Sequence, residues 1–195
     1  MAADVWLISG IPGSGKSTTA RLLAERFDRS VHIEGDLLHD WVVRGKVGPG
    51  DEPAGESKRQ IRLCVRNQCL LARSFAEAGF TAIVDYVIEN PAAHLSQLPG
   101  LSVRFVVLSP GREAAIARDR DRPQSIRHRA KHGVSIAERF AYLEEGFLGS
   151  RGRGLWLDTR ALTPEQAVEA ILERQDEALI QRAIPEDQEK PHAGT

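Results

Sequence analysis

The stretch GIPGSGKST, residues 10–18, has the residue types and the spacing that bind phosphate groups. Glycines in a G-x-x-x-x-G-K-[ST] loop let backbone N–H groups converge on phosphate oxygens, Lys16 reaches the β- and γ-phosphates, and the Ser17 hydroxyl ligates Mg²⁺. A helix beginning at Lys16 adds the positive end of its dipole. We therefore expect ATP and Mg²⁺ to bind here. The expected nucleotide-binding residues are Gly10, Ile11, Pro12, Gly13, Ser14, Gly15, Lys16, Ser17 and Thr18.

Two aspartates follow apolar runs that read as strands. Asp36 ends the run VHIEGD, and Asp85 comes late in FTAIVDYVI. Phosphoryl transfer needs one carboxylate to help hold Mg²⁺ and another to accept the proton of the acceptor hydroxyl. We assign Asp85, with Ser17, to the metal and Asp36 to the proton. The alternative for Asp36 is a plain helix N-cap, because helix-like LLHDWV follows it.

A basic segment, RDRDRPQSIRHRAKH at residues 118–132, is expected to form a lid. Pro123 interrupts it, so we expect a long irregular loop, and such loops in compact domains are commonly binding loops. Arg118 and Arg122 are four residues apart and are expected to place positive charge over the phosphates or the base of ATP. The alternative is a solvated charged face. A second mobile segment, residues 45–56, is rich in Gly and Pro.

Other cationic side chains are candidates for contacting the acceptor. Arg62 and Arg66 are spaced by one turn on a helix expected over 56–78, where a solvated stripe is the alternative. His39 and Arg44 flank the region after Asp36. If these residues face the site, they would bind an anionic acceptor.

The elements that must position these residues alternate between strand-like and helix-like patterns. This alternation predicts α/β architecture with a five-stranded parallel sheet flanked by helices, in which ligands bind beyond the carboxyl ends of the strands. The expected strands are VWLISG near residues 5–10, then 31–36, 80–88, 102–109 and 154–159. The expected helices are 16–27, 37–43, 56–78, 112–119, 135–148 and 164–182. The last of these should begin with Thr163 as N-cap and Gln166 three residues later.

Length and composition favour one domain, which we place at residues 1–182, with 183–195 as a disordered tail. The 195 residues carry 26 Lys and Arg against 27 Asp and Glu, so the formal net charge of −1 gives no global attraction to nucleic acid or to anionic membranes. Cys64 and Cys69 fit neither a redox pair nor a zinc site. No apolar run is long enough to span a membrane. We expect a cytoplasmic protein, as a monomer or homodimer.

The stretches GIPGSGKSTTARLL, HIEGDLLH, TAIVDYVI and the basic segment before SIAERFAYLEEGF together resemble the small P-loop kinases. The resemblance is to the group of gluconate kinases, chloramphenicol phosphotransferases and zeta toxins, which are related to nucleoside monophosphate kinases. It implies a P-loop NTPase fold with a lid, and it implies that Asp36 acts as general base. DYVIENP lacks the arginine that monophosphate kinases have after this strand, and the residues after GDLLH differ from those of gluconate kinases.

These observations lead us to expect an ATP-dependent kinase that phosphorylates a hydroxyl group of a small molecule, such as a sugar derivative, an antibiotic or another metabolite. Lys16, Asp36 and an arginine of the lid are the expected catalytic residues. Two alternatives remain open. One is a polynucleotide 5′-hydroxyl kinase, which would want a basic groove. The other is an ATP-binding regulatory switch without an acceptor.

Overall fold

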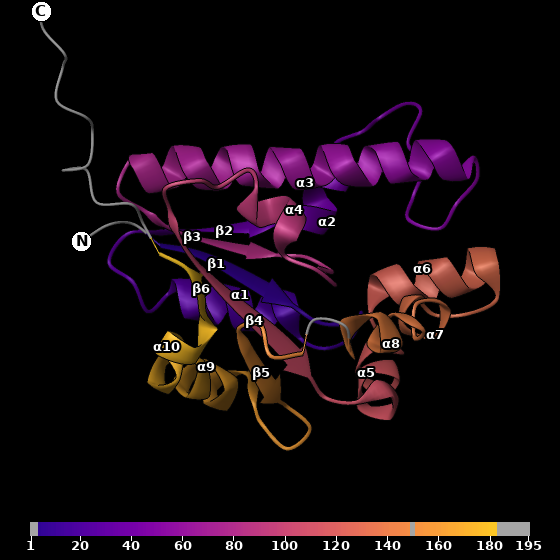
Figure 1. The fold of residues 1–195 in the computed structure, drawn as a ribbon. Helices are drawn as coiled ribbons and strands as arrows, with labels where there is room; N and C mark the ends of the chain where they lie inside the picture. The colour runs from indigo at the N-terminus through magenta and orange to yellow at the C-terminus, as the bar shows by residue number, and fades with distance from the viewer. Residues whose placement is uncertain (1–3, 149–150, 183–195) are drawn as a thin grey trace, which may run out of the picture.

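The computed structural model describes residues 4–148 and 151–182, and it has an α/β fold built on one central sheet (Figure 1). The strand order is β2-β3-β1-β4-β5, all parallel, and the short strand β6 pairs antiparallel with β4. The bounds are β1 Asp4–Ser9, β2 Ser30–Glu34, β3 Thr81–Asp85, β4 Ser102–Ser109, β5 Leu155–Asp158 and β6 Leu179–Gln181. The five predicted strands and their parallel arrangement are thus confirmed, and β6 was missed.

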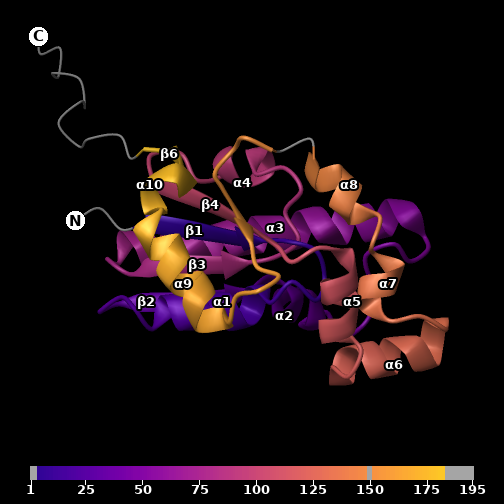
Figure 2. The ribbon, with the colours of Figure 1, turned by 90° about the horizontal axis from the view of Figure 1, so that it is seen from below.

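Helices cover both faces of the sheet. Figure 1 shows α3 and α4 above it and α1, α9 and α10 below it, and Figure 2 shows α5 to α8 gathered beyond one end of the strands. The bounds are α1 Lys16–Ala24, α2 Gly35–Asp40, α3 Ala54–Glu77, α4 Ala92–Leu95, α5 Arg112–Asp119, α6 Pro123–His132, α7 Ile136–Arg139, α8 Leu143–Leu148, α9 Pro164–Glu173 and α10 Gln175–Ala178. No helix within these described residues is both long and apolar enough to cross a membrane.

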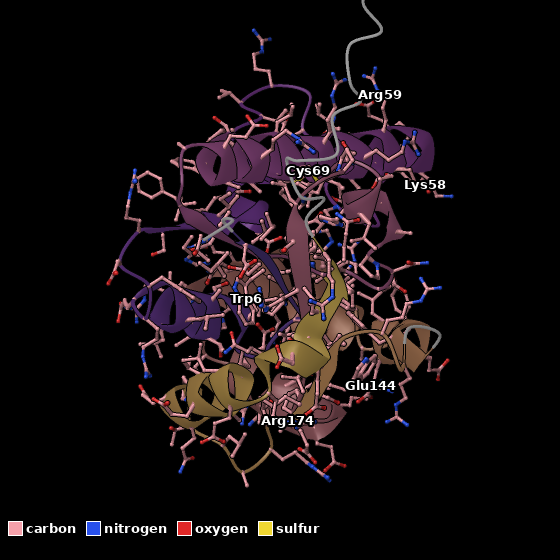
Figure 3. All side chains as sticks on the ribbon, turned by 60° about the vertical axis from the view of Figure 1, so that its left-hand side comes forward. Trp6, Lys58, Arg59, Cys69, Glu144 and Arg174 are labelled. Carbon is pink, nitrogen blue, oxygen red and sulfur yellow. The ribbon has the colours of Figure 1, made fainter. Side chains whose placement is uncertain are left out.

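The core has two halves because side chains along a strand alternate between the faces of the sheet. On β1, Val5 and Leu7 pack into the cluster that contains the inner side of α3, whereas Trp6 and Ile8 pack into the cluster with α1 and α9. Trp6 is only 1% exposed and is labelled near the centre of Figure 3. Burial on both faces fixes the sheet and therefore fixes where its carboxyl ends point.

The predicted start of α9 is confirmed in detail. The Thr163 hydroxyl accepts a hydrogen bond from the backbone N–H of Gln166 at 3.2 Å, and the Gln166 side chain accepts one from the Thr163 N–H at 2.9 Å. This reciprocal pair is a capping box, with Pro164 at the first helical position, where its missing N–H removes no helical hydrogen bond. The predicted helix over 164–182 ends earlier, however, and is followed by α10 and β6.

The basic segment 118–132 is not the irregular loop that we expected. α5 continues to Asp119 and α6 begins at Pro123, so nearly the whole segment is helical. Pro123 starts a helix because its fixed φ suits the first turn, while Arg122 before it is extended. The predicted helix 135–148 is two short helices, α7 and α8. The predicted tail, 183–195, lies outside the described residues.

Candidate active site

The loop between β1 and α1 has the geometry of a phosphate-binding loop, and two of its glycines are required sterically. Gly13 has φ +84°, and a Cβ there would lie 2.2 Å from the backbone oxygen of Ala115 in α5. Gly10 has φ +143°, and its Cβ would lie 2.5 Å from the backbone oxygen of Leu108 in β4. The loop therefore packs against the end of β4 and the lid-bearing helix α5, and only glycine fits this backbone.

The side chain of Lys16, the first residue of α1, extends back to the phosphate loop. Its Nζ donates a hydrogen bond to the backbone oxygen of Ile11 at 3.2 Å, and the side chain is buried. Burial lowers the pKa of the Lys16 ammonium below its usual value, while the carboxylates of Asp36 and Asp85 act in the opposite direction and Arg122 adds to the lowering. The structure thus brings four of the predicted charged residues into one electrostatic neighbourhood.

Ser17 and Asp85, the predicted magnesium ligands, are in contact. The Ser17 hydroxyl donates to Asp85 Oδ1 at 3.1 Å. Asp85 has the same parity as Ile83 on β3, so its side chain faces α1. A hydroxyl and a carboxylate suit Mg²⁺, which prefers oxygen ligands and shares its shell with substrate phosphates and water. The arrangement fits the cation that ATP carries.

His32 of β2 holds the other oxygen of that carboxylate, and our sequence reasoning missed it. Its Nε2 lies 2.5 Å from Asp85 Oδ2. The signal that could have found this contact is the alternation of side chains along a strand. His32 is in register with Ile83, so its side chain faces the same side of the sheet as that of Asp85. The contact fixes the Asp85 carboxylate beside Ser17, so His32 orients a residue that we predict to be a metal ligand.

Asp36 lies in the first turn of α2, since β2 ends two residues earlier at Glu34. The N-cap is Glu34, so the capping alternative for Asp36 is wrong. The backbone bends sharply into α2 at Gly35, where a Cβ would come within 2.5 Å of Gln68 and of the Tyr86 ring. This tight packing against α3 and the end of β3 fixes the first turn of α2, from which the charge of Asp36 acts on Lys16 of the phosphate loop.

Asp36 is exposed to solvent, although its carboxyl group is partly desolvated by the neighbouring protein. These surroundings raise its pKa above the usual value of 3.8, chiefly through burial. The Lys16 ammonium opposes the shift, and the neighbouring carboxylates of Asp85 and Asp40 add to it. A carboxylate with a raised pKa is a better proton acceptor than one with the ordinary pKa.

The candidate acceptor residues are not all brought together. His39 lies on the buried side of α2 at 6% exposure, and neither ring nitrogen has a hydrogen-bond partner among the described residues. Arg44, Arg62 and Arg66 are exposed. Figure 3 shows α3, where Arg62 and Arg66 lie, as an outer layer of the molecule. Arg62 and Arg66 lie on the solvated side of α3, which was the alternative interpretation of this stripe. Arg44 lies in the loop after α2.

The two arginines of the basic segment have different surroundings. Arg118 donates from Nη2 to the backbone oxygens of Thr159 at 2.9 Å and Arg160 at 3.3 Å, which ties α5 to the loop after β5. Arg122 is the one whose charge acts on Lys16. Because Arg118 is bonded to the loop after β5 and the charge of Arg122 acts on Lys16, Arg122 is the better candidate for a phosphate-facing arginine.

The two segments that we expected to be mobile, 45–56 and 118–132, are connected through Arg139. Arg139 of α7 donates to the backbone oxygen of Gly50 at 2.8 Å and to Asp51 Oδ1 at 2.9 Å. This guanidinium holds the pKa of Asp51 below its usual value. Arg139 also donates to Nε2 of His128 in α6 at 3.2 Å. The loop after α2 and the lid thus form one hydrogen-bonded unit, which no sequence pattern indicated.

A cavity of about 260 Å³ adjoins the first residues of the phosphate loop, Gly10 and Ile11. Its far wall is formed by Phe147 of α8 and Trp156 of β5. The charged residues Lys16, Ser17, Asp36 and Asp85 do not line it, so it lies beside the charged cluster rather than over it.

The fold and this cluster define a P-loop protein, with a phosphate-binding loop and a hydrogen-bonded serine–aspartate pair beside it. A family model described as "AAA domain" matches residues 5–134. The chain belongs to this family of AAA domains. Among curated proteins, a UPF0200 protein of Aeropyrum pernix is 36% identical over 55 residues, and the match spans only 28% of this chain and 29% of that protein.

Solved structures with the same fold include several kinases. A tunicamycin resistance protein of Deinococcus radiodurans is 24% identical, with a TM-score of 0.59, and the match covers 94% of this chain and 99% of that one. A gluconokinase of Sinorhizobium meliloti is 19% identical, with a TM-score of 0.59 and coverage of 91% and 94%. A sugar kinase of Janibacter is 21% identical, with a TM-score of 0.59 and coverage of 91% and 96%. At these identities the similarity establishes the fold.

Proposed function

We propose that this chain is an ATP-dependent phosphotransferase that moves the γ-phosphate of ATP to a hydroxyl group of a small molecule. The observation that carries the proposal is the convergence of the Asp36 carboxylate and the Ser17–Asp85 pair on Lys16. A protein that only binds ATP needs the loop, the lysine and the metal ligands. A second, proton-accepting carboxylate next to them is what transfer to a hydroxyl group requires in addition.

Each residue of the cluster has a distinct role in this proposal. Lys16 leaves the Ile11 carbonyl and pairs with the β- and γ-phosphates, together with the loop N–H groups. Ser17 and Asp85 hold Mg²⁺, which neutralises charge on the phosphate oxygens when it is bound. Asp36 accepts the proton of the attacking hydroxyl. Arg122 stabilises negative charge on the transferring group.

A small-molecule acceptor agrees better with the surface charge than a nucleic acid does. The formal net charge is −1, and a nucleic-acid kinase needs enough positive charge to neutralise several phosphates. Structurally similar proteins named for a small-molecule substrate or drug include the gluconokinase, the sugar kinase and the tunicamycin resistance protein. We therefore propose a hydroxylated metabolite or antibiotic as the acceptor.

The location and assembly of the protein remain predictions. Cys64 and Cys69 are both free and buried, which agrees with a cytoplasmic protein. We keep the expectation of a monomer or homodimer, which size-exclusion chromatography with light scattering can test.

The test is a panel of hydroxyl compounds incubated with γ-labelled ATP and Mg²⁺, with phosphorylated products identified by mass. The panel should include sugar acids such as gluconate, neutral sugars, tunicamycin and other hydroxylated antibiotics, and a 5′-hydroxyl oligonucleotide. We expect transfer to one of the small molecules, abolished by Lys16→Ala. Transfer to the oligonucleotide alone would contradict a small-molecule acceptor. ATP binding without transfer to any compound would favour the regulatory switch.

A further inference from the structure

Asp119, the last residue of α5, is a buried carboxylate at the centre of the lid. It is 1% exposed, in a segment whose neighbours Arg120 and Asp121 are exposed. A buried carboxylate requires compensating hydrogen bonds or an ion pair. The partners of Asp119 therefore indicate what the residue does.

One oxygen of Asp119 organises the two helices that follow it. Oδ2 accepts hydrogen bonds from the Ser125 hydroxyl in α6 and from the backbone N–H of Ala137, at 2.9 Å, in the first turn of α7. Ser125 is fully buried, and its hydroxyl also accepts a bond from the backbone N–H of Ile136 at 3.4 Å. The carboxylate is thus fixed in position by the lid helices.

The other oxygen of Asp119 faces Arg122. Oδ1 lies 3.6 Å from Arg122 Nη1, and the backbone N–H of Arg122 donates to the backbone oxygen of Asp119 at 3.2 Å, which closes a turn. A separation of 3.6 Å is an ion pair without a direct hydrogen bond. The guanidinium has five N–H groups, so this single contact orients it and leaves donors for another anion.

The position of Arg122 indicates that this second anion is a phosphate group of ATP. Helix α5, which ends at Asp119 three residues before Arg122, packs on the phosphate loop at Gly13, where a Cβ would lie 2.2 Å from the backbone oxygen of Ala115. In agreement with this packing, the charges of both Arg122 and Asp119 act on the pKa of Lys16, Arg122 lowering it and Asp119 raising it. Its side chain is 46% exposed, whereas that of Asp119 is 1% exposed. A fixed, buried carboxylate therefore holds an exposed guanidinium near the place where the terminal phosphate of ATP binds.

We propose that Asp119 is a positioning residue, which orients Arg122 toward the γ-phosphate. The inference rests on the proposed function, because it takes the anion to be that phosphate. It predicts that Asp119 contributes to the preference for ATP over ADP although it does not touch the nucleotide. A purely structural Asp119 would affect the stability of the lid without changing this preference.

The experiment measures, by calorimetry with Mg²⁺, the affinity for a non-hydrolysable ATP analogue and for ADP, and takes their ratio. In Asp119→Asn the amide oxygen still accepts from Ala137, while the amide NH₂ faces Arg122 and cannot pair with it. Arg122→Met removes the guanidinium. A charge-assisted hydrogen bond is worth about tenfold or more in affinity, so we expect Arg122→Met to lower the ratio by about that factor. We expect Asp119→Asn to approach the same value.

A double mutant and two controls separate positioning from structure. If Asp119 acts through Arg122, then Asp119→Asn has no further effect on the ratio in the Arg122→Met background. Asp121→Asn, the same change at an exposed position two residues away, should keep the wild-type ratio. Ser125→Ala removes a lid hydrogen bond without touching the Oδ1 that faces Arg122, so it should lower stability and keep the ratio.

The outcomes are distinct. An unchanged or increased ratio in Asp119→Asn, or an equal loss in both backgrounds, overturns the inference. If Asp119→Asn does not fold, Asp119→Glu takes its place, because it keeps the charge but moves the carboxylate relative to Arg122. A lowered ratio that is absent in the Arg122→Met background then supports the inference, and any other pattern overturns it. The ratio needs no acceptor, so failure of the hydroxyl panel would refute the proposed function without altering this result.

Discussion

Replacing Asp36 by Asn is the change that best separates a kinase from a protein that only binds ATP. The amide keeps the shape of the side chain but cannot accept a proton from a hydroxyl group. A positioned general base contributes about 10²–10⁴ in rate, or about 2.7–5.4 kcal/mol of activation free energy. Transfer should fall by that factor. ATP affinity should stay the same or rise slightly, because a negative charge near Lys16 and the phosphates is removed.

The same substitution has a predictable effect on stability. Burial raises the pKa of Asp36 in the folded state above its unfolded value of about 3.8. The stabilisation linked to this proton is complete below pH 3.8 and is lost as the pH rises through the folded pKa. At neutral pH the ionised carboxylate is therefore slightly unfavourable, and Asp36→Asn should melt at the same temperature or higher. The gain is small, because the side chain is accessible to solvent.

The assay combines product formation with the acceptor from the panel, ATP affinity by calorimetry, and melting curves at pH 4 and pH 7. Wild-type transfer should increase with pH through a pKa above 3.8. Asp40→Asn is the matched control, one turn along α2, and it should transfer phosphate within a few-fold of wild type. Unchanged transfer in Asp36→Asn would refute the assignment and move the base to Glu34 or Asp85. Loss of ATP binding would make Asp36 a metal or structural residue.

Three further predictions test the loop and the lid. Lys16→Ala should abolish transfer and weaken ATP binding, measured by calorimetry, because no other side chain of the loop carries a positive charge. The variant should still fold. Wild-type turnover in this variant would disprove the phosphate-loop assignment. Gly13→Ala should lower the melting temperature by about 2–8 °C and weaken ATP binding. The reason is that a left-handed backbone conformation costs about 1–2 kcal/mol for a residue with a side chain, and the new Cβ would meet Ala115. A variant with normal melting temperature and normal ATP affinity would contradict the close packing. Residues 45–56 and 118–132 should become protected from limited proteolysis when an ATP analogue and an acceptor are both bound, and unchanged cleavage at both segments would count against a lid.

The strands and the phosphate loop were predictable because their signals are local. Apolar runs such as VRFVVL in β4 are typical of strands buried on both faces, and the glycine spacing of the loop is set by backbone geometry. Tertiary context decided the rest. A proline such as Pro123 can interrupt a segment or occupy the first turn of a helix, and in the structure it begins α6. β6 has three residues, and its pairing with β4 depends on where α10 ends.

The site was only partly predictable for the same reason. Lys16, Ser17, Asp36 and Asp85 follow from motif and strand order, and the structure places all four together. His32 contacts Asp85 from a neighbouring strand 53 residues away in sequence, and only the register between β2 and β3 shows it. Contacts of that kind are set by packing, which one sequence read by local pattern does not contain.

The bond between Arg139 and the loop after α2 changes how the lid must work. The first turn of α7 is hydrogen-bonded to the Asp119 carboxylate through the N–H of Ala137. Arg139, in the same helix, donates hydrogen bonds to Gly50 and Asp51. Asp119 in turn pairs with Arg122 beside the phosphate loop. Movement of the loop 45–53, which follows the helix that bears Asp36, is thus connected through hydrogen bonds and an ion pair to the arginine at the phosphate site. Acceptor entry and phosphate contact are therefore expected to respond together, so the two segments should become protected from proteolysis at the same ligand concentrations.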